Sequence, residues 1–411
     1  MRYKNSRHSQ NHFLDSVKNL VGIVVYFFCQ WLTLIIIIRI AGYTVSGEYS
    51  LIISFTNLFG FLSQYNIRSF QLSDMNNKYL PQQYSGAYII TGGLAVAFFL
   101  LALPFSGFNQ EIIISCMIYM LFKLCETFSG YVFTYMQLEN KYSDIAISNC
   151  LKGIIPLIGF TLWLYFSKDL FQCLCIMSLL FFAIIITYDL KRTRAFIFRG
   201  VVIKGTINIL KECFPMMLSS LILPFMLFLT RYSIERVYGV TELGYYSALT
   251  MVITVLSTMA SAVYMVLLPV ISDKYIKQLK SDVVKIIFMM LGIIIVVLLI
   301  VLLLARLIGD LMFSFVFGVE ILKYMYLLTP VIITGVMLVL LSFFSTCLIA
   351  MQKRVSALVG MLSGAVFLSV MVMPATQKGG MLGTTYIFTI SLFVVTVIYS
   401  FIIHRNLCNL A

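Results

Sequence analysis

The sequence predicts an all-α integral membrane protein, with twelve transmembrane helices arranged in two six-helix lobes. Two observations predict this fold. The 411 residues are 61% hydrophobic and only 11% charged, whereas a soluble domain is roughly half apolar and a quarter charged. The pattern R-x-x-G-x-T-x-x-G-x-Y-S also occurs twice, at 39–50 and at 236–247. The composition therefore places the chain in the membrane, and the repeat divides it into two related halves.

Apolar runs long enough to span a bilayer recur along the whole chain. A helix needs about 20 apolar residues to cross the hydrocarbon core, and helices are expected because that core offers backbone groups no water. The predicted spans are 20–40, 50–67, 86–104, 112–136, 145–166, 170–188, 213–232, 244–270, 286–308, 323–350, 355–374 and 380–403.

The two motif copies occupy equivalent places in the two halves. Each copy follows the first apolar run of its half and precedes the second, which argues against a chance match. Met136-Gln137 and Met351-Gln352 form a weaker echo at the ends of the fourth and tenth spans. Because six spans separate the motif copies, we expect a pseudo-two-fold axis along the membrane normal.

Domain boundaries follow from the longest internal loop, predicted at 189–212. We expect an N-terminal lobe over 1–190, a basic linker over 191–212, and a C-terminal lobe over 213–411. The linker alternates apolar and basic residues, which fits either an amphipathic interfacial helix or a segment that only fixes topology. Gly200 and Gly205 weaken the helical interpretation.

The distribution of Lys and Arg predicts the orientation. With a cytoplasmic N-terminus, twenty of the 29 Lys and Arg residues fall on the inner side and seven on the outer side, so both termini are expected in the cytoplasm. The formal net charge of +13 comes from short loops between apolar runs. It therefore indicates topology, and no nucleic-acid partner is expected.

Motifs for enzymatic chemistry are not found in the sequence. It has no G-x-x-x-x-G-K-[ST] phosphate loop, and its nine cysteines and three histidines do not have zinc-ligand spacing. We therefore expect no catalytic residues, no cofactor, no metal site and no enzymatic activity.

The informative residues are charges inside or at the ends of apolar runs. Lys123 and Glu126 lie near the middle of the fourth span, on one helical face, and Glu126 is the only carboxylate expected at depth. Lys152 lies about two turns into the fifth span, and Arg68 at the inner end of the second. Such charges are costly and face a cavity or a partner, so they either line a binding site or fix helix packing.

The balance of these charges points to an anionic substrate. The deep cations belong mainly to the first half, and a net-positive wall suits a phosphate or pyrophosphate group. We expect this wall to lie in a cavity between the lobes.

Two stretches carry a resemblance to a known family. The segment YNIRSFQLSD at 65–74, followed by Lys78-Tyr79, and the twice-occurring G-x-x-x-x-G-x-Y-S are similar to segments of bacterial O-antigen and capsule repeat-unit flippases. These belong to the polysaccharide-transport branch of the MATE-like MOP flippase superfamily.

The resemblance implies a substrate and a mechanism. It implies that an undecaprenyl-diphosphate-linked oligosaccharide crosses the bacterial cytoplasmic membrane by alternating access, for O-antigen, capsule or exopolysaccharide biosynthesis. It implies a basic cavity, for which Lys123, Lys152 and Arg68 are the matching positions, with Glu126 moderating their potential or coupling to Na+ or H+. The sugar would then meet polar side chains such as Gln30, Asn57, Gln64 and Asn149. The polysaccharide polymerase machinery is a further expected partner.

Three alternatives remain at the level of sequence. A MATE-type cation-coupled drug or metabolite exporter would share the fold but favours acidic cavity residues. A major-facilitator transporter would carry a basic G-x-x-x-D-R-x-G-R-R-like loop after its second helix, which 68–84 does not match. A membrane glycosyltransferase or polymerase would need a longer outer loop than any expected here.

The predicted topology is testable with reporters that are active only outside the cytoplasm. Fusions within 104–111 or 375–380 should be active and fusions within 189–204 silent, because the Lys and Arg bias places the last segment inside. Reporter activity per unit of membrane protein is the measurement, and the opposite pattern would invert the topology.

Overall fold

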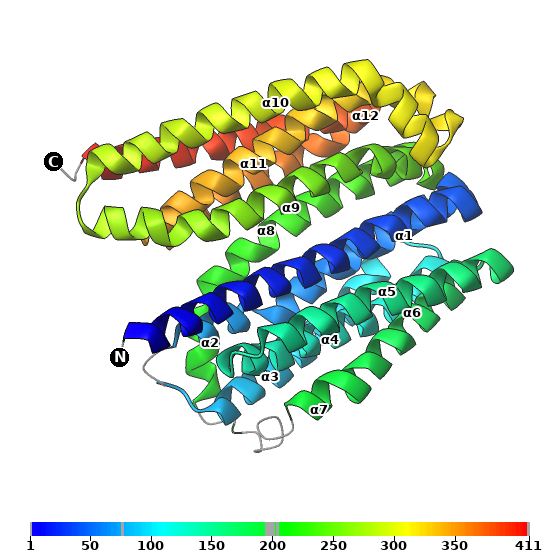
Figure 1. The fold of residues 1–411 in the computed structure, drawn as a ribbon. Helices are drawn as coiled ribbons and strands as arrows, with labels where there is room; N and C mark the ends of the chain where they lie inside the picture. Colours follow the sequence, from blue (N-terminus) through cyan, green and yellow to red (C-terminus); the bar gives the residue numbers. More distant parts are fainter. Residues whose placement is uncertain (1, 75–77, 194–201, 203–204, 409–411) are drawn as a thin grey trace. The chain divides into compact units, whose positions relative to one another are not determined.

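The computed structural model describes residues 2–74, 78–193, 202 and 205–408, and they are helical almost throughout (Figure 1). Ten described helices are long and apolar enough to cross a membrane. The chain divides into two compact units, one of residues 1–42 and 52–217, the other of 43–51 and 218–411.

The first unit contains most of α1 and the helices up to the start of α8. Its elements are α1 (Arg2–Gln64), α2 (Ile67–Ser73), α3 (Pro81–Ala102), η1 (Leu103–Phe105), α4 (Gln110–Leu138), α5 (Tyr142–Ser167), α6 (Leu170–Ile184), the π-helical η2 (Ile185–Asp189), α7 (Leu190–Arg192) and the beginning of α8 (Thr206–Tyr238). α6 packs against both α4 and α5, and these three helices form much of the wall of the site described below.

The second unit is built around α11. Its further elements are the rest of α8, α9 (Val240–Ile276), α10 (Lys280–Phe317), η3 (Val319–Leu327), α11 (Leu328–Ala350) and α12 (Arg354–Cys408). α11 packs against α9 and α12 and is two-thirds buried, whereas only 11% of the apolar window of α10 is buried. α10 therefore presents most of its surface outward, as a lipid-facing helix does.

The expected loops at 41–49 and around 375–379 are not observed as loops. α1 and α12 each run through these regions, and each is interrupted at a single glycine with non-helical dihedrals, Gly42 and Gly380. The predicted spans on each side are therefore separate helical stretches, but the loops expected between them are each reduced to one glycine. Motif residues such as Thr44 and Ser46 lower the local hydropathy although they lie in the next helical stretch.

The linker expected at 191–212 is only partly described, since 194–201 and 203–204 lie outside the described residues. The described parts are helical at both ends, because α7 continues to Arg192 and α8 begins at Thr206. Residues 206–212 thus belong to the long helix α8.

The two motif copies have the same backbone break. Gly42 has φ 87° and ψ 179°, and its counterpart Gly239 has φ 88° and ψ 174°. A positive φ of this size favours glycine because other residues have a Cβ that clashes. In both copies a new helical stretch then begins at the next residue.

Within the second unit, these two stretches pack backbone against backbone. Thr44 and Thr241, which are equivalent, share a hydrogen bond between their hydroxyls at 2.9 Å. A Cβ on Gly47 would lie 1.9 Å from the carbonyl oxygen of Val240, and a Cβ on its counterpart Gly244 would lie 2.0 Å from that of Tyr43. The contact is self-complementary, as a two-fold axis requires.

We expect Gly47→Ala and Gly244→Ala to destabilise the protein to a similar degree, by at least about 1–3 kcal/mol, because each methyl group would meet a backbone carbonyl that cannot rotate away. The control is Gly93→Ala in α3, where a Cβ meets nothing within 4 Å. Thermal unfolding of the purified variants is the measurement. Equal stability of Gly47→Ala and Gly93→Ala would contradict the close contact.

Candidate functional site

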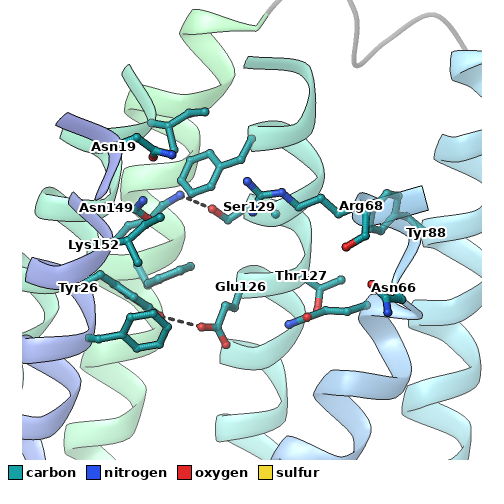
Figure 2. Close-up of a pocket in the computed structure, with 18 residues that line it drawn as sticks. Asn19, Tyr26, Asn66, Arg68, Tyr88, Glu126, Thr127, Ser129, Asn149 and Lys152 are labelled. Atoms are coloured by element: carbon teal, nitrogen blue, oxygen red, sulfur yellow. Dashed lines mark hydrogen bonds between the residues drawn. The ribbon is translucent and has the colours of Figure 1, made fainter. Parts of the chain in front are cut away.

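The first unit contains a cavity of about 350 Å³, and most of the residues that line it have polar side chains (Figure 2). Its walls come from α1 to α6 and from the turn before α2. Figure 2 shows Lys152 and Asn149 on one side and Arg68 and Tyr88 on the other, with α4 between them. The polar lining residues are Asn19, Tyr26, Gln64, Asn66, Arg68, Ser69, Tyr88, Glu126, Thr127, Ser129, Asn149 and Lys152.

A buried ion pair forms the α5 side of the cavity. Lys152 on α5 is 2% exposed and pairs with Asp189, which is 0% exposed. The ammonium group also donates to the Ser129 hydroxyl on α4, and Ser148 donates to the other carboxylate oxygen of Asp189 at 2.6 Å. Two buried charges are tolerated in this way because each finds an opposite charge and further hydrogen bonds.

Aromatic rings complete the surroundings of the Lys152 ammonium group. It lies 4.4 Å from the ring centroid of Phe133 and 5.3 Å from that of Phe181. A cation over the face of an aromatic ring is attracted by the ring's quadrupole. Lys152 is therefore held in one position, with its charge at the wall of the cavity.

Asp189 was not predicted as a site residue, because its position in the sequence indicates the start of a loop and leaves Glu126 as the only carboxylate expected at depth. In the structure it ends η2, a π-helical turn between α6 and α7. A π-helical turn shifts the register of the side chains that follow, and such turns are frequent at functional sites. The signal available in the sequence was one acidic residue between Tyr188 and the basic run that begins at Lys191.

A second ion pair lies on α4. Lys123 donates to Glu126 at 2.8 Å, as their spacing of three predicts. Tyr26 on α1 donates its hydroxyl to the other oxygen of Glu126 at 2.9 Å, and Figure 2 shows this bond from α1 to α4. Glu126 lines the cavity, whereas Lys123 pairs with Glu126 and is not among the described lining residues.

Arg68 supplies a further cation to the cavity. Its guanidinium group donates to the side-chain oxygen of Gln137 at 3.2 Å. Among the residues that the structure describes, no carboxylate forms an ion pair with it. Lys123 and Lys152 are each paired with a carboxylate. The unpaired charge of Arg68 therefore gives the cavity a net positive charge.

The structure thus brings together three of the four predicted site residues. Arg68, Glu126 and Lys152 line one cavity, and Lys123 contacts it through Glu126. Of the polar residues expected to meet a sugar, Gln64 and Asn149 line the cavity, whereas Gln30 and Asn57 are not among its described lining residues. The cavity lies within the first unit, and the inter-lobe cavity stays a prediction.

Comparison with known proteins identifies the family. Residues 16–275 match the family model described as "Polysaccharide biosynthesis protein". The chain belongs to this family. A relative, the capsular polysaccharide biosynthesis protein CapF of Staphylococcus aureus, is 26% identical over 400 residues, which cover 92% of this chain and 95% of CapF.

Solved structures show that this polysaccharide biosynthesis protein has a MATE-like fold. A mutant of the Vibrio cholerae MATE transporter VcmN matches with a TM-score of 0.61 at 14% identity, covering 97% of this chain and 98% of VcmN. A MOP superfamily transporter from Pyrococcus furiosus, whose binding pocket is described as having reverse polarity, matches with a TM-score of 0.63 at 12% identity, covering 96% and 95%. The chain is thus a multi-pass membrane protein with a MATE-like fold.

We expect Lys152→Met to destabilise the protein by about 3–5 kcal/mol, because Asp189 would remain buried without a counter-charge. The double variant Lys152→Met with Asp189→Asn should recover most of this loss. Thermal unfolding in detergent is the measurement. Lys277→Met, which breaks the exposed pair with Asp273, is the control and should change stability by less than about 1 kcal/mol. A double variant as unstable as the single one would contradict this account.

Proposed function

We propose that this family member is a flippase that moves an undecaprenyl-diphosphate-linked oligosaccharide repeat unit from the inner to the outer leaflet by alternating access. Family membership and the similarity to CapF support a role in surface polysaccharide biosynthesis. The observation that carries the proposal is the cavity's net positive charge, which suits the diphosphate of such a substrate.

The proposed architecture has twelve spans in two six-helix lobes. Ten candidate spans are described, and α1 and α12 are each long enough for two spans, divided at Gly42 and Gly380. The identical backbone break at Gly42 and Gly239 supports a duplicated unit. In this proposal 1–190 and 213–411 form the lobes, and both termini are cytoplasmic in a bacterial cell.

Arg68 is the proposed contact to the diphosphate. A guanidinium group binds phosphate oxygens through two parallel N–H donors, and Gln137 engages only part of the fork. Lys152 on the opposite wall is a second proposed cation of the site, although Asp189 compensates most of its charge. Gln64 and Asn149 supply hydrogen-bonding groups for sugar hydroxyls, while the apolar polyprenyl tail stays in the bilayer.

Glu126 has a proposed role in coupling. It is a carboxylate at the cavity wall, bound by Lys123 and by the Tyr26 hydroxyl. Protonation of Glu126 would weaken the bond between α1 and α4, because a neutral carboxyl group accepts the Tyr26 hydroxyl less strongly than a carboxylate does. Na+ would act at the other oxygen of Glu126, in place of Lys123. This same carboxylate favours the second candidate function, a MATE-type cation-coupled exporter, whose fold the chain shares.

Arg68→Ala should abolish surface polymer in a complementation assay while membrane abundance stays near that of the wild type, because the diphosphate would lose its charged contact. Arg68→Lys should retain part of the activity, since the charge remains but the planar fork is lost. Immunoblotting of surface polymer, normalised to membrane protein, is the measurement. Arg192→Ala is the matched control, because Arg192 is 53% exposed and pairs with Asp144.

The same strains separate the two candidate functions. Full polymer display by Arg68→Ala would overturn the diphosphate contact. A change in resistance to cationic drugs that follows Glu126→Gln, with surface polymer intact, would favour the exporter.

A further inference from the structure

A second cavity of about 300 Å³ lies in the first unit, beside the first one. The short helix α2 borders both cavities, because Arg68 lines the first and Gln71, one turn later, lines the second. A chain of ring contacts also joins them. Tyr88 of the first cavity contacts Tyr131 at 4.9 Å between centroids, and Tyr131 contacts Tyr135 of the second at 5.0 Å.

The walls of the second cavity are aromatic. Tyr79, Tyr84 and Tyr135 all line it. Their hydroxyls already have partners, since Tyr79 donates to Glu212 at 2.7 Å, Tyr84 to Asp74 at 2.9 Å and Tyr135 to the Pro81 carbonyl at 3.3 Å. The rings are thereby fixed, and their carbon surfaces are what the cavity presents.

The polar groups of the cavity include hydrogen-bond acceptors that a ligand could use. Gln71 is 6% exposed, and its side-chain oxygen has no hydrogen-bond partner among the described residues. A buried acceptor left without a donor costs about 1–3 kcal/mol. A ligand that brings a donor to Gln71 would remove this cost.

Two carboxylates set the sign of the charge. Asp74 accepts from the backbone amides of Lys78 at 3.0 Å and Tyr79 at 3.2 Å. Burial alone would raise the pKa of Asp74, but these amides and the Tyr84 hydroxyl lower it below its usual value, so the group stays ionised at neutral pH. Glu139 lines the same cavity and pairs with Lys141.

These features select among ligand classes. An anion would meet two carboxylates, and a hard metal ion would find Asp74 already accepting three hydrogen bonds and Glu139 already paired. A neutral sugar ring fits both kinds of wall, because its C–H face packs on aromatic carbon and its hydroxyls donate to acceptors. A volume of about 300 Å³ is at the lower end for small-molecule sites, which suits a single sugar ring.

We propose that this second cavity binds one neutral sugar ring, with its hydroxyls donating to Gln71 and Glu139 and its face against Tyr84. The inference rests on the proposed function for the source of the sugar, a residue of the lipid-linked oligosaccharide. It adds to that function a saccharide site separate from the diphosphate site at Arg68.

The test is saturation-transfer NMR on the purified full-length protein in nanodiscs, with glucose, galactose, N-acetylglucosamine, glucuronate and choline as probes. At least one neutral sugar should bind saturably. Glucuronate should bind more weakly than glucose because its carboxylate would approach Asp74 and Glu139. Gln71→Leu should weaken neutral-sugar binding by up to about tenfold, the worth of one hydrogen bond.

Further variants separate packing from binding. Tyr84→Phe keeps the ring and should retain more binding than Tyr84→Leu. Leu138→Trp places a large ring at the cavity from a position that is 54% exposed, so it should block binding in a folded protein. Gln110→Leu, an exposed change at the other end of α4, is the control and should bind as the wild type does.

Several results would overturn the inference. These are no saturable binding of any of the three neutral sugars, equal binding by wild type, Gln71→Leu and Leu138→Trp, or a preference for choline or glucuronate. Arg68→Ala should leave monosaccharide binding unchanged, which keeps the two proposals separable. If Arg68→Ala loses polymer display but the wild-type protein binds no sugar, the proposed flippase function is retained and the saccharide site is rejected. If the wild-type protein binds a neutral sugar but Arg68→Ala keeps full polymer display, the saccharide site is retained and the diphosphate contact at Arg68 is rejected.

Discussion

The first cavity depends on the burial of Lys152 beside Asp189. A charge in the apolar interior of a membrane protein is stable only where another group compensates it. The pair meets this condition and joins α5 to the π-helical turn after α6, while the bond from Lys152 to Ser129 adds α4. One ammonium group thus links α5, α4 and the π-helical turn after α6.

The charge of the cavity follows from which cations are paired. Lys152 is compensated by Asp189, and Lys123 by Glu126, so the two deep lysines contribute little net charge. Arg68, which engages an amide oxygen, is what remains. The proposed contact to a diphosphate therefore rests more on an arginine at the edge of the apolar region than on the deep lysines. A guanidinium group is also less strongly hydrated than an ammonium group, so it is better suited to a contact that forms and breaks.

How much could be predicted from the sequence depended on how local each feature is. The Lys123–Glu126 pair is one turn of one helix, and spacing alone predicted it. Lys152 and Asp189 are 37 residues apart, and nothing in hydropathy links them; the fall in hydropathy at 189 even suggested a loop. The repeat located Gly42 and Gly239 correctly. It did not show that 43–51 pack with the second unit, because a pattern of residues does not state which backbone each glycine faces.

The similarity between the two motif copies extends to their backbone contact, whereas the charged site lies in the first unit alone. Gly47 and Gly244 each face the carbonyl of the residue equivalent to the other's partner, so a side chain at either position would separate the two helical stretches. Their identity is imposed by sterics and applies to both copies at once. The cavity has no such constraint. Its cations all belong to the first unit, because the groups that an ion pair or an arginine contacts need to be present only in the unit that contains it. A duplicated scaffold can therefore keep a symmetric contact and still carry an asymmetric binding chemistry.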